Sequence, residues 1–345
     1  MATRTTTTRT TSFASVPSAD PTVAPYPFRD LVQAYYDCRR TKRNSASALA
    51  FEMDLERNLI NLHEDLVAGS YRPGRSICFV VTRPKAREVW AAAFRDRIVH
   101  HLLYNHIGAS IEAKFIADSC ACIPERGTLY AAERLEAKVR SVTQNWRRPA
   151  HYLKMDLANF FVAIDKRVLT NQLVRLIDEP WWRRLALQVL WHDPRVDYEV
   201  RSRRGLFNKV PQHKRLTAQT AHLGLPIGNL SSQFFANIYL NDLDQFVKHQ
   251  LRAKHYIRYV DDFLLLHDSP QACPSRTRCS PHTYRRNQAI AHFSRCSHER
   301  TSDPIQRADG SSHPGRPEDG HPPGDEAAAR LPRLNGRSQY AIQDA

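Results

Sequence analysis

One stretch constrains the fold more than any other: residues 255–267, which read His-Tyr-Ile-Arg-Tyr-Val-Asp-Asp-Phe-Leu-Leu-Leu-His. The stretch is apolar and rich in strand-forming residues, except for two adjacent aspartates at its centre. It predicts two short strands, 256–259 and 263–266, joined by a tight turn. A strand interior does not favour two neighbouring carboxylates, whereas a turn can aim both at one point. Asp261 and Asp262 therefore suit a hard cation such as Mg²⁺, although turns also carry Asp as an ordinary solvated residue.

Charge and length favour a partner that carries many negative charges. The 345 residues suffice for two or three domains or for one large enzyme core. Lys and Arg number 50 against 35 Asp and Glu, a net charge of +15, which points first to nucleic acid. No apolar run is long enough for a membrane span, and the N-terminus lacks the apolar segment of a signal peptide. The seven cysteines are scattered without a CxxC pair, so we expect a reduced, cytoplasmic protein.

The two ends of the chain differ in composition from its middle. Residues 1–27 are rich in Thr, Ser, Arg and Pro and show no apolar periodicity. Residues 269–345 are dominated by Arg, Ser, His, Pro and Gly, and no period of 2 or 3.6 residues persists there. Segments of this kind cannot bury enough apolar surface to fold. We therefore expect two disordered tails around a folded middle.

The folded middle is predicted to be mostly helical, with a few strands. Leucines spaced 4, 3 and 4 residues apart between positions 55 and 66 indicate one face of an amphipathic helix. Gly127 followed by Thr128 suits a helix start, with the threonine hydroxyl as a cap or the free N–H groups as an anion seat. Further helices are expected at residues 89–106, 128–140, 166–177, 181–191 and 231–248, and a strand at 77–82.

Residues 152–157 form a further predicted strand with a useful parity. Its odd-numbered positions are apolar and would face a core, so Asp156 lies on the opposite face near the end of the strand. Phe161 follows five residues later and places aromatic bulk beside that carboxylate. If this strand and the hairpin are adjacent, Asp156, Asp261 and Asp262 can gather around two Mg²⁺ ions. Such ions activate a 3′-hydroxyl and stabilise the leaving pyrophosphate in nucleotidyl transfer.

Basic and glycine-rich stretches fit the same chemistry. Lys85 and Arg87 lie in a charged loop and are either ordinary solvated charges or contacts to phosphate groups. Residues 195–222 are basic with little apolar period, which suits a ribbon that follows a phosphate backbone. Gly224 and Gly228 precede a helix, and two glycines so placed let the backbone approach a ligand closely.

Together these motifs resemble those of reverse transcriptases, in the right order over residues 28–268. Tyr259-Val-Asp-Asp resembles the hairpin motif of the polymerase palm. The first palm motif is resembled by residues 152–164, and the motif that holds nucleotide and template by residues 224–233. The fingers are resembled by residues 83–97 and 115–128.

This resemblance implies a fold, an activity and a role for each candidate residue. The fold is the right-hand polymerase fold, of class α+β, with fingers at residues 28–150 and an antiparallel palm at residues 151–268. The activity is RNA-directed DNA synthesis on a template RNA, with a cDNA primer and dNTPs. The implied Mg²⁺ ligands are Asp156, Asp261 and Asp262, and the implied gate against the ribose 2′-hydroxyl is Phe161. The implied triphosphate contacts are Lys85 and Arg87, and the implied nucleotide pocket includes Ile227 and Gly228.

One motif narrows the resemblance to a subgroup. Ile227-Gly-Asn-Leu-Ser-Ser-Gln233 is similar to the reverse transcriptases of diversity-generating retroelements, whereas most others place a Gln before that glycine. The subgroup implies copying of a template-repeat RNA into error-prone cDNA, with frequent errors opposite adenines. It also implies a small basic accessory variability protein as a partner. An apolar Ile227 in place of an amide removes a polar contact near the incoming nucleotide, which is a physical source of loose selection.

The chain departs from the family pattern after His267. The family continues with further palm elements, a primer grip and a helical thumb, and residues 269–345 show no pattern for any of them. They resemble an out-of-frame or foreign tail, so we expect a weak or inactive polymerase from the chain as written. Two alternatives stay open. One is an inactive remnant that only binds RNA; the other is a reverse transcriptase of the retron or group II intron kind, against which the Ile227 and Gln233 pattern counts.

Overall fold

The computed structural model describes residues 26–40 and 45–269. The predicted tails lie outside these ranges apart from residues 26, 27 and 269, and so does the predicted lack of a thumb. Tyr26 belongs to the folded core although it falls within the predicted N-terminal tail. Its ring is buried against Trp182, and its hydroxyl donates a hydrogen bond to the carbonyl of Trp181 at 2.9 Å.

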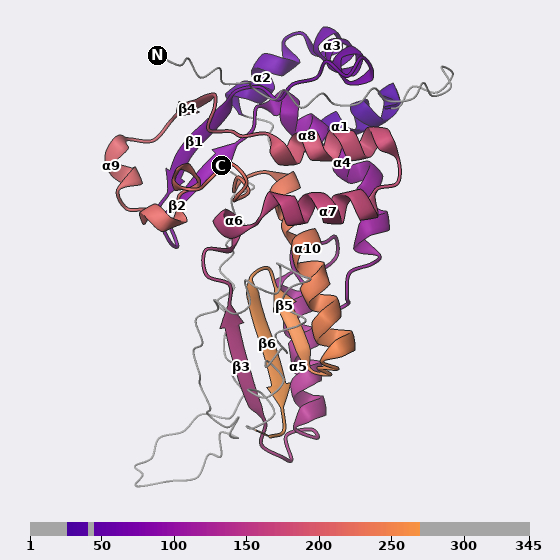
Figure 1. Cartoon of the computed structure of the whole chain (residues 1–345), viewed down its shortest axis with the longest axis vertical. Coiled ribbons are helices and arrows are strands. Elements are labelled where there is room, and N and C mark those ends of the chain that lie inside the picture. The colour runs from indigo at the N-terminus through magenta and orange to yellow at the C-terminus, as the bar shows by residue number, and fades with distance from the viewer. Residues whose placement is uncertain (1–25, 41–44, 270–345) are drawn as a thin grey trace, which may run out of the picture.

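Two three-stranded sheets carry the β structure. In the first, β1 (Ser76–Val81) pairs antiparallel with β2 (Arg87–Ala91) and parallel with β4 (Tyr198–Val200). In the second, the strand order is β3-β6-β5 and every pairing is antiparallel. The bounds of these strands are His151–Asp156 for β3, Tyr256–Tyr259 for β5 and Asp262–His267 for β6. Figure 1 shows the first sheet in the upper part and the second in the lower part of an elongated molecule.

Helices connect and cover the sheets, so the chain has the mixed α+β character expected from the sequence. The first four helices are α1 (Phe28–Arg40), α2 (Ala46–Glu52), α3 (Leu55–Val67) and α4 (Phe94–Glu112). The others are α5 (Thr128–Val142), α6 (Phe160–Ala163), α7 (Lys166–Leu176), α8 (Pro180–Trp191), α9 (Arg204–Phe207) and α10 (Leu230–Gln245). None of the helices in the described ranges combines the length and apolar character needed to cross a membrane.

Helix α10 is the centre of the main core. Most of its residues are buried, among them Phe234, Phe235 and Ile238, as expected for a helix surrounded by protein on nearly all sides. The same continuous apolar cluster takes in side chains from α1, α3, α4, α7 and α8 and from one face of the second sheet. Helix α10 and one face of the second sheet therefore share one core, whereas Trp90 of β2 and Leu216 belong to a separate small cluster.

One predicted helix begins too early. The sequence predicts a helix over residues 89–106, but Val89, Trp90 and Ala91 belong to β2 and the helix α4 begins at Phe94. Valine and tryptophan favour strands, and here they pair with the neighbouring strand β1 in a register that joins Phe79 to Val89. Pairing with β1 therefore decides the conformation of residues 89–91, and a search for helical periodicity cannot detect that pairing.

The second sheet is covered on both faces, whereas the sequence predicted a core on one face of β3 only. Met155 packs into the main core as predicted. On the opposite face, Tyr152 packs with Ile257 and Leu266 against α5 in a smaller apolar cluster. The cover ends before the end of β3, and Asp156 remains exposed as the parity predicts. The strand thus presents its carboxylate where the helix no longer covers the sheet.

Candidate active site

The hairpin turn displays two aspartates through a strained backbone. Tyr259 pairs with Asp262, so Val260 and Asp261 form the turn itself. Val260 has a φ of 56°, a conformation that a β-branched residue adopts only when its surroundings enforce it. Two hydrogen bonds do so: the Arg258 guanidinium donates to the carbonyl of Val260 at 3.0 Å, and the Leu157 N–H donates to the carbonyl of Asp261 at 3.3 Å.

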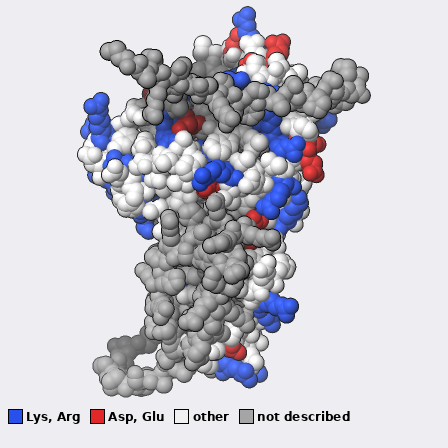
Figure 2. Space-filling view, in the orientation of Figure 1, with Lys and Arg blue, Asp and Glu red and all other residues white. Residues whose placement is uncertain are grey.

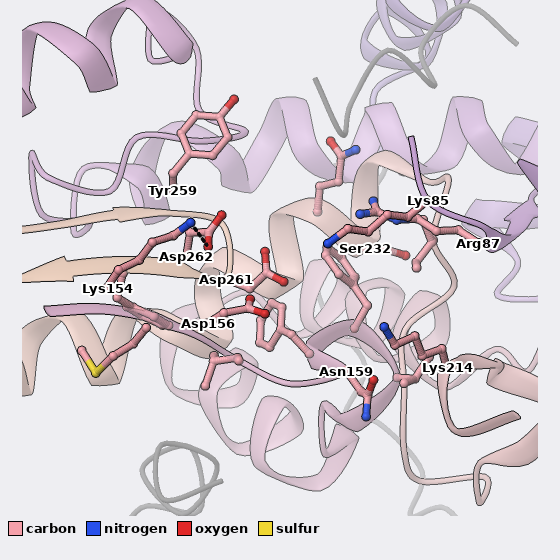
Figure 3. Close-up of a pocket in the computed structure, with 18 of the residues that line it drawn as sticks. Lys85, Arg87, Lys154, Asp156, Asn159, Lys214, Ser232, Tyr259, Asp261 and Asp262 are labelled. Carbon is pink, nitrogen blue, oxygen red and sulfur yellow. Dashed lines mark ion pairs between the residues drawn. The ribbon is translucent and has the colours of Figure 1, made fainter. Parts of the chain in front are cut away.

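Strand β3 supplies the third carboxylate. Its last residue, Asp156, pairs directly with Asp262 in the antiparallel register with β6. Asp156, Asp261 and Asp262 all line one cavity of about 540 Å³, and Figure 3 shows their carboxylates gathered on one side of it. The structure therefore brings together the three acids that the sequence singled out.

The three carboxylates repel one another with little compensation. Burial, together with the charges of Asp156 and Asp262, raises the pKa of Asp261 from 3.8 to about 7, against the opposing influence of Arg87. Burial and the charge of Asp262 also raise the pKa of Asp156. Among the ion pairs of the described residues, one reaches this cluster: Lys154 Nζ lies 4.0 Å from Asp262 Oδ1. Ion pairing thus offsets the mutual repulsion at one of the three carboxylates, Asp262.

The chemistry of this donor set fits a hard divalent cation. In the described part of the chain, no group of three or more His, Cys, Asp or Glu residues is arranged as a ready-made metal site. The Asp156, Asp261 and Asp262 oxygens are nevertheless the ligand type that Mg²⁺ prefers. A bound cation would also relieve the repulsion that raises the pKa of Asp261. These residues are therefore the ones that could hold the metal.

Three cations face the carboxylates across the cavity. Lys85, Arg87 and Lys214 line it, and the side chain of each forms no hydrogen bond or ion pair with another described residue. The sequence pointed to Lys85 and Arg87, whereas Lys214 was one of several basic residues in a long segment. Thr128, which the sequence offered as a cap or an anion seat, also lines the cavity, and so do Lys154, Asn159 and Ser232, to which the sequence assigned no role at the site. Unpaired cations around one cavity suit a polyanionic ligand.

Phe161 lies beside the carboxylates, as its spacing from Asp156 suggests. It belongs to the short helix α6 and lines the same cavity. Its ring meets that of Phe160 edge to face, with centroids 5.3 Å apart. The carbonyl of Phe161 accepts a hydrogen bond from the Leu225 N–H at 2.8 Å. This contact ties the aromatic residue to the glycine loop that follows.

Gly228 serves a close approach to protein, not only to a ligand. Ile227 and Gly228 line the cavity, and the Trp90 N–H donates to the carbonyl of Ile227 at 2.7 Å. A Cβ on Gly228 would lie 2.8 Å from Val89 Cγ1, and its φ is +118°. Gly224 likewise packs against Val162 and does not line the cavity, so the expectation that both glycines admit a ligand is wrong for Gly224.

Replacing Gly228 with Ala should destabilise the chain by about 1–3 kcal/mol, because the new Cβ meets β2 and the backbone is in a region that L-residues avoid. Thermal unfolding of the purified chain measures the effect. Gly205→Ala is the matched control, since a Cβ there meets nothing within 4 Å. Equal melting temperatures for the two variants would contradict this account of the glycine loop.

The start of α5 also differs from expectation. Gly127 occupies the N-cap position and no side chain caps the helix, so the Thr128 hydroxyl is not a cap. It lies 3.3 Å from the hydroxyl of Tyr259, the residue that precedes the turn. The threonine therefore contacts the hairpin instead of its own helix.

The family model described as reverse transcriptase (RNA-dependent DNA polymerase) matches residues 81–301. The chain belongs to the reverse transcriptase family. The matched range includes both strands of the hairpin, β3 and every residue that lines the cavity, and it extends beyond the described residues. No curated protein matches this reverse transcriptase.

Several solved structures are similar to this reverse transcriptase at low identity. A partial Cas6-RT-Cas1–Cas2 complex has 19% identity and a TM-score of 0.38, over 70% of this chain and 37% of that one. A Cas6-RT-Cas1–Cas2 complex has the same identity and TM-score, over 70% of this chain and 23% of that one. An apo telomerase from Candida tropicalis, truncated from its C-terminal domain, has 11% identity and a TM-score of 0.44, over 73% and 56%. This chain thus spans less than two thirds of each.

Proposed function

We propose that the chain is an RNA-directed DNA polymerase that extends a cDNA primer on a template RNA. One observation supports this function above all others: three carboxylates face three unpaired cations across a single cavity of about 540 Å³. A nucleoside triphosphate with its divalent cation is a ligand that both sides of such a cavity suit. In this proposal residues 28–150 form the fingers and residues 151–268 the palm.

The reaction is nucleotidyl transfer. The 3′-oxygen of the primer forms a bond to the α-phosphorus of the dNTP, and the bond from that phosphorus to the β-bridging oxygen breaks. The primer loses its hydroxyl proton to solvent, and pyrophosphate leaves with the electron pair. Asp156, Asp261 and Asp262 would hold the Mg²⁺ ions, whose chemistry when bound would be to activate the hydroxyl and to neutralise the leaving group. Lys85 and Arg87 bind the triphosphate and hold the α-phosphorus in place.

Two further features support a polymerase that makes DNA on RNA. Phe161 lines the cavity beside Asp156, where its ring would collide with a ribose 2′-hydroxyl and so select dNTPs. The net charge of +15 supplies attraction to the phosphate backbone. Figure 2 shows Lys and Arg side chains over both the upper and the lower part of one face, interspersed with Asp and Glu.

We further propose that the chain acts as a reverse transcriptase of a diversity-generating retroelement. It would copy a template-repeat RNA with frequent errors, with a small basic accessory variability protein as its partner. Ile227 supports it, because an apolar side chain lines the nucleotide cavity there. An amide at this position would offer a hydrogen bond that rejects a mispaired nucleotide by leaving a polar group unpaired. The apolar Ile227 has no polar group to leave unpaired, so a mispaired nucleotide carries no such cost at this position.

Ile227→Gln should lower misincorporation opposite template adenine several-fold, because it restores a polar contact to the nucleotide. Sequencing of products from a defined RNA template gives the error spectrum. Ile227→Leu is the control, since it keeps the site apolar and should keep the wild-type spectrum. An unchanged spectrum in Ile227→Gln would show that another part of the site sets the selectivity.

Single-turnover primer extension, with the chain in excess over primer, tests the activity itself and registers even weak polymerisation. Incorporation of dNTPs on an RNA template supports the proposal. RNA binding without incorporation supports the inactive remnant instead.

A further inference from the structure

Lys214 occupies a place in the cavity that its sequence context does not suggest. It ends a short 3-10 turn, Gln212–Lys214, within the basic segment of residues 195–222. Figure 3 shows its ammonium group directed into the space in front of Asp156, from a different side than Lys85. Lys85 and Arg87 come from the β1–β2 connection and the start of β2, so Lys214 supplies positive charge from an independent part of the chain.

The loop that carries Lys214 is anchored, which distinguishes it from an ordinary surface loop. Glu88 on β2 is buried, and its Oε2 accepts hydrogen bonds from the Leu216 N–H at 2.7 Å and from Trp90 Nε1 at 3.0 Å. Its Oε1 accepts one from the Thr217 hydroxyl at 3.3 Å. A buried carboxylate with three donors holds its partners firmly, so the backbone next to Lys214 is fixed to the strand that carries Arg87.

A second anchor acts on the same loop from another direction. The Arg195 guanidinium donates to the carbonyl of Leu216 at 3.0 Å and to that of Gln219 at 2.6 Å, while Asp193 pairs with the same guanidinium at 2.7 Å. Arg215 donates to the carbonyl of Val210 at 2.9 Å. Polar groups of residues near Lys214 thus form hydrogen bonds that hold the loop in place. The Lys214 side chain, in contrast, has no hydrogen-bond or ion-pair partner among the described residues.

The Lys214 side chain lines the same cavity as Asp156, together with Lys85 and Lys154. A flexible lysine on a fixed loop is well suited to meet a phosphate group as a point charge. In nucleotidyl transfer, the negative charge grows on the β- and γ-phosphates as pyrophosphate leaves, and a cation placed there stabilises the transition state.

We propose that Lys214 is a third cation for the triphosphate of the incoming nucleotide and contacts the phosphates that leave as pyrophosphate. This assignment rests on the proposed polymerase function. It makes the loop of residues 212–217 part of the nucleotide site, and it gives Glu88 the role of a positioning residue that acts through this loop.

Two measurements on the full chain test the assignment. The first is calorimetric binding of inorganic pyrophosphate and of orthophosphate in the presence of Mg²⁺, which needs no turnover. Lys214→Ala should weaken pyrophosphate binding about tenfold, the size expected for one charge-assisted contact, and should change orthophosphate binding less. Lys209→Ala is the matched control, because it removes the same charge from the same segment but does not line the cavity. Lys214→Arg should restore most of the affinity.

The second measurement is single-nucleotide extension of a primer on RNA. Lys214→Ala should raise the KM for dNTP and lower kcat, whereas Lys209→Ala should change neither. Glu88→Ala should reproduce part of the Lys214→Ala effect on pyrophosphate binding. Wild-type affinity for pyrophosphate in Lys214→Ala, or an equal loss in Lys209→Ala, would overturn the assignment. A wild-type chain that binds pyrophosphate through Lys214 but never extends a primer would instead overturn the polymerase function.

Discussion

Asp261→Asn should lower primer extension by about a thousandfold or more while leaving the fold at least as stable as in the wild type. The loss follows because the metal loses a ligand at the position where it supplies several kcal/mol of transition-state stabilisation. The stability follows because Asp261 is partly buried and is repelled by Asp156 and Asp262, which raises its pKa to about 7. A neutral amide of the same shape removes that cost.

The effect of Asp261→Asn on stability should depend on pH. The folded pKa of Asp261 lies above its ordinary value of 3.8, so the ionised carboxylate destabilises the fold fully above about pH 7 and ceases to do so as the pH falls toward 4. Asp261→Asn should therefore melt above the wild type at pH 8 and close to it at pH 4, in the presence of a chelator. A variant that melts well below the wild type at pH 8 would mean that the carboxylate is structural.

Arg258→Met should destabilise the chain by about 3–5 kcal/mol, because it leaves the buried charge on Asp244 without its cation, although the Tyr256 hydroxyl still donates a hydrogen bond to that carboxylate. Both side chains are fully buried, and Arg258 Nη2 lies 2.7 Å from Asp244 Oδ2. The same guanidinium donates to the Asn237 side chain, to the Ser119 hydroxyl and to the carbonyl of Val260. Chemical denaturation measures the loss, and primer extension should fall with it.

A double variant separates stability from positioning at this site. Arg258→Met with Asp244→Asn removes both charges and should recover part of the lost stability. The carbonyl of Val260 still lacks its donor, so the turn should stay loose and extension should stay low. Arg39→Met, which breaks the ion pair with Glu52, is a control far from the hairpin and should leave extension intact in the folded fraction. A double variant with wild-type stability and wild-type extension would contradict a positioning role for Arg258.

Local patterns predicted the hairpin well. The first predicted strand, residues 256–259, has the bounds of β5, and the second differs from β6 by one residue at each end. An apolar, strand-forming run interrupted by two aspartates is encoded within a dozen positions, so little outside the stretch can change the outcome. The parity that placed Asp156 on an open face held for the same reason at its end of β3.

Contacts between distant segments decided what the sequence could not show. Val89 and Trp90 form a strand because β1 lies beside them, not because of their neighbours in the chain. Lys214 reaches the cavity because Leu216 hydrogen-bonds to Glu88, 128 residues earlier. The need for glycine at position 228 was readable, but its packing partner on β2 was not. A charged residue in a long basic segment carries no signal of which cavity it will face.

The most direct test of the central claim is single-turnover extension of a DNA primer on an RNA template by the purified 345-residue chain. With dNTPs and Mg²⁺, the wild type should add nucleotides slowly, as expected for a weak polymerase. A chelator should stop the addition, and Asp156→Asn should lose it while binding the same primer–template with unchanged affinity. Extension by Asp156→Asn at the wild-type rate, or tight binding of primer–template by a wild type that never adds a nucleotide, would contradict the claim that these carboxylates form a polymerase active site.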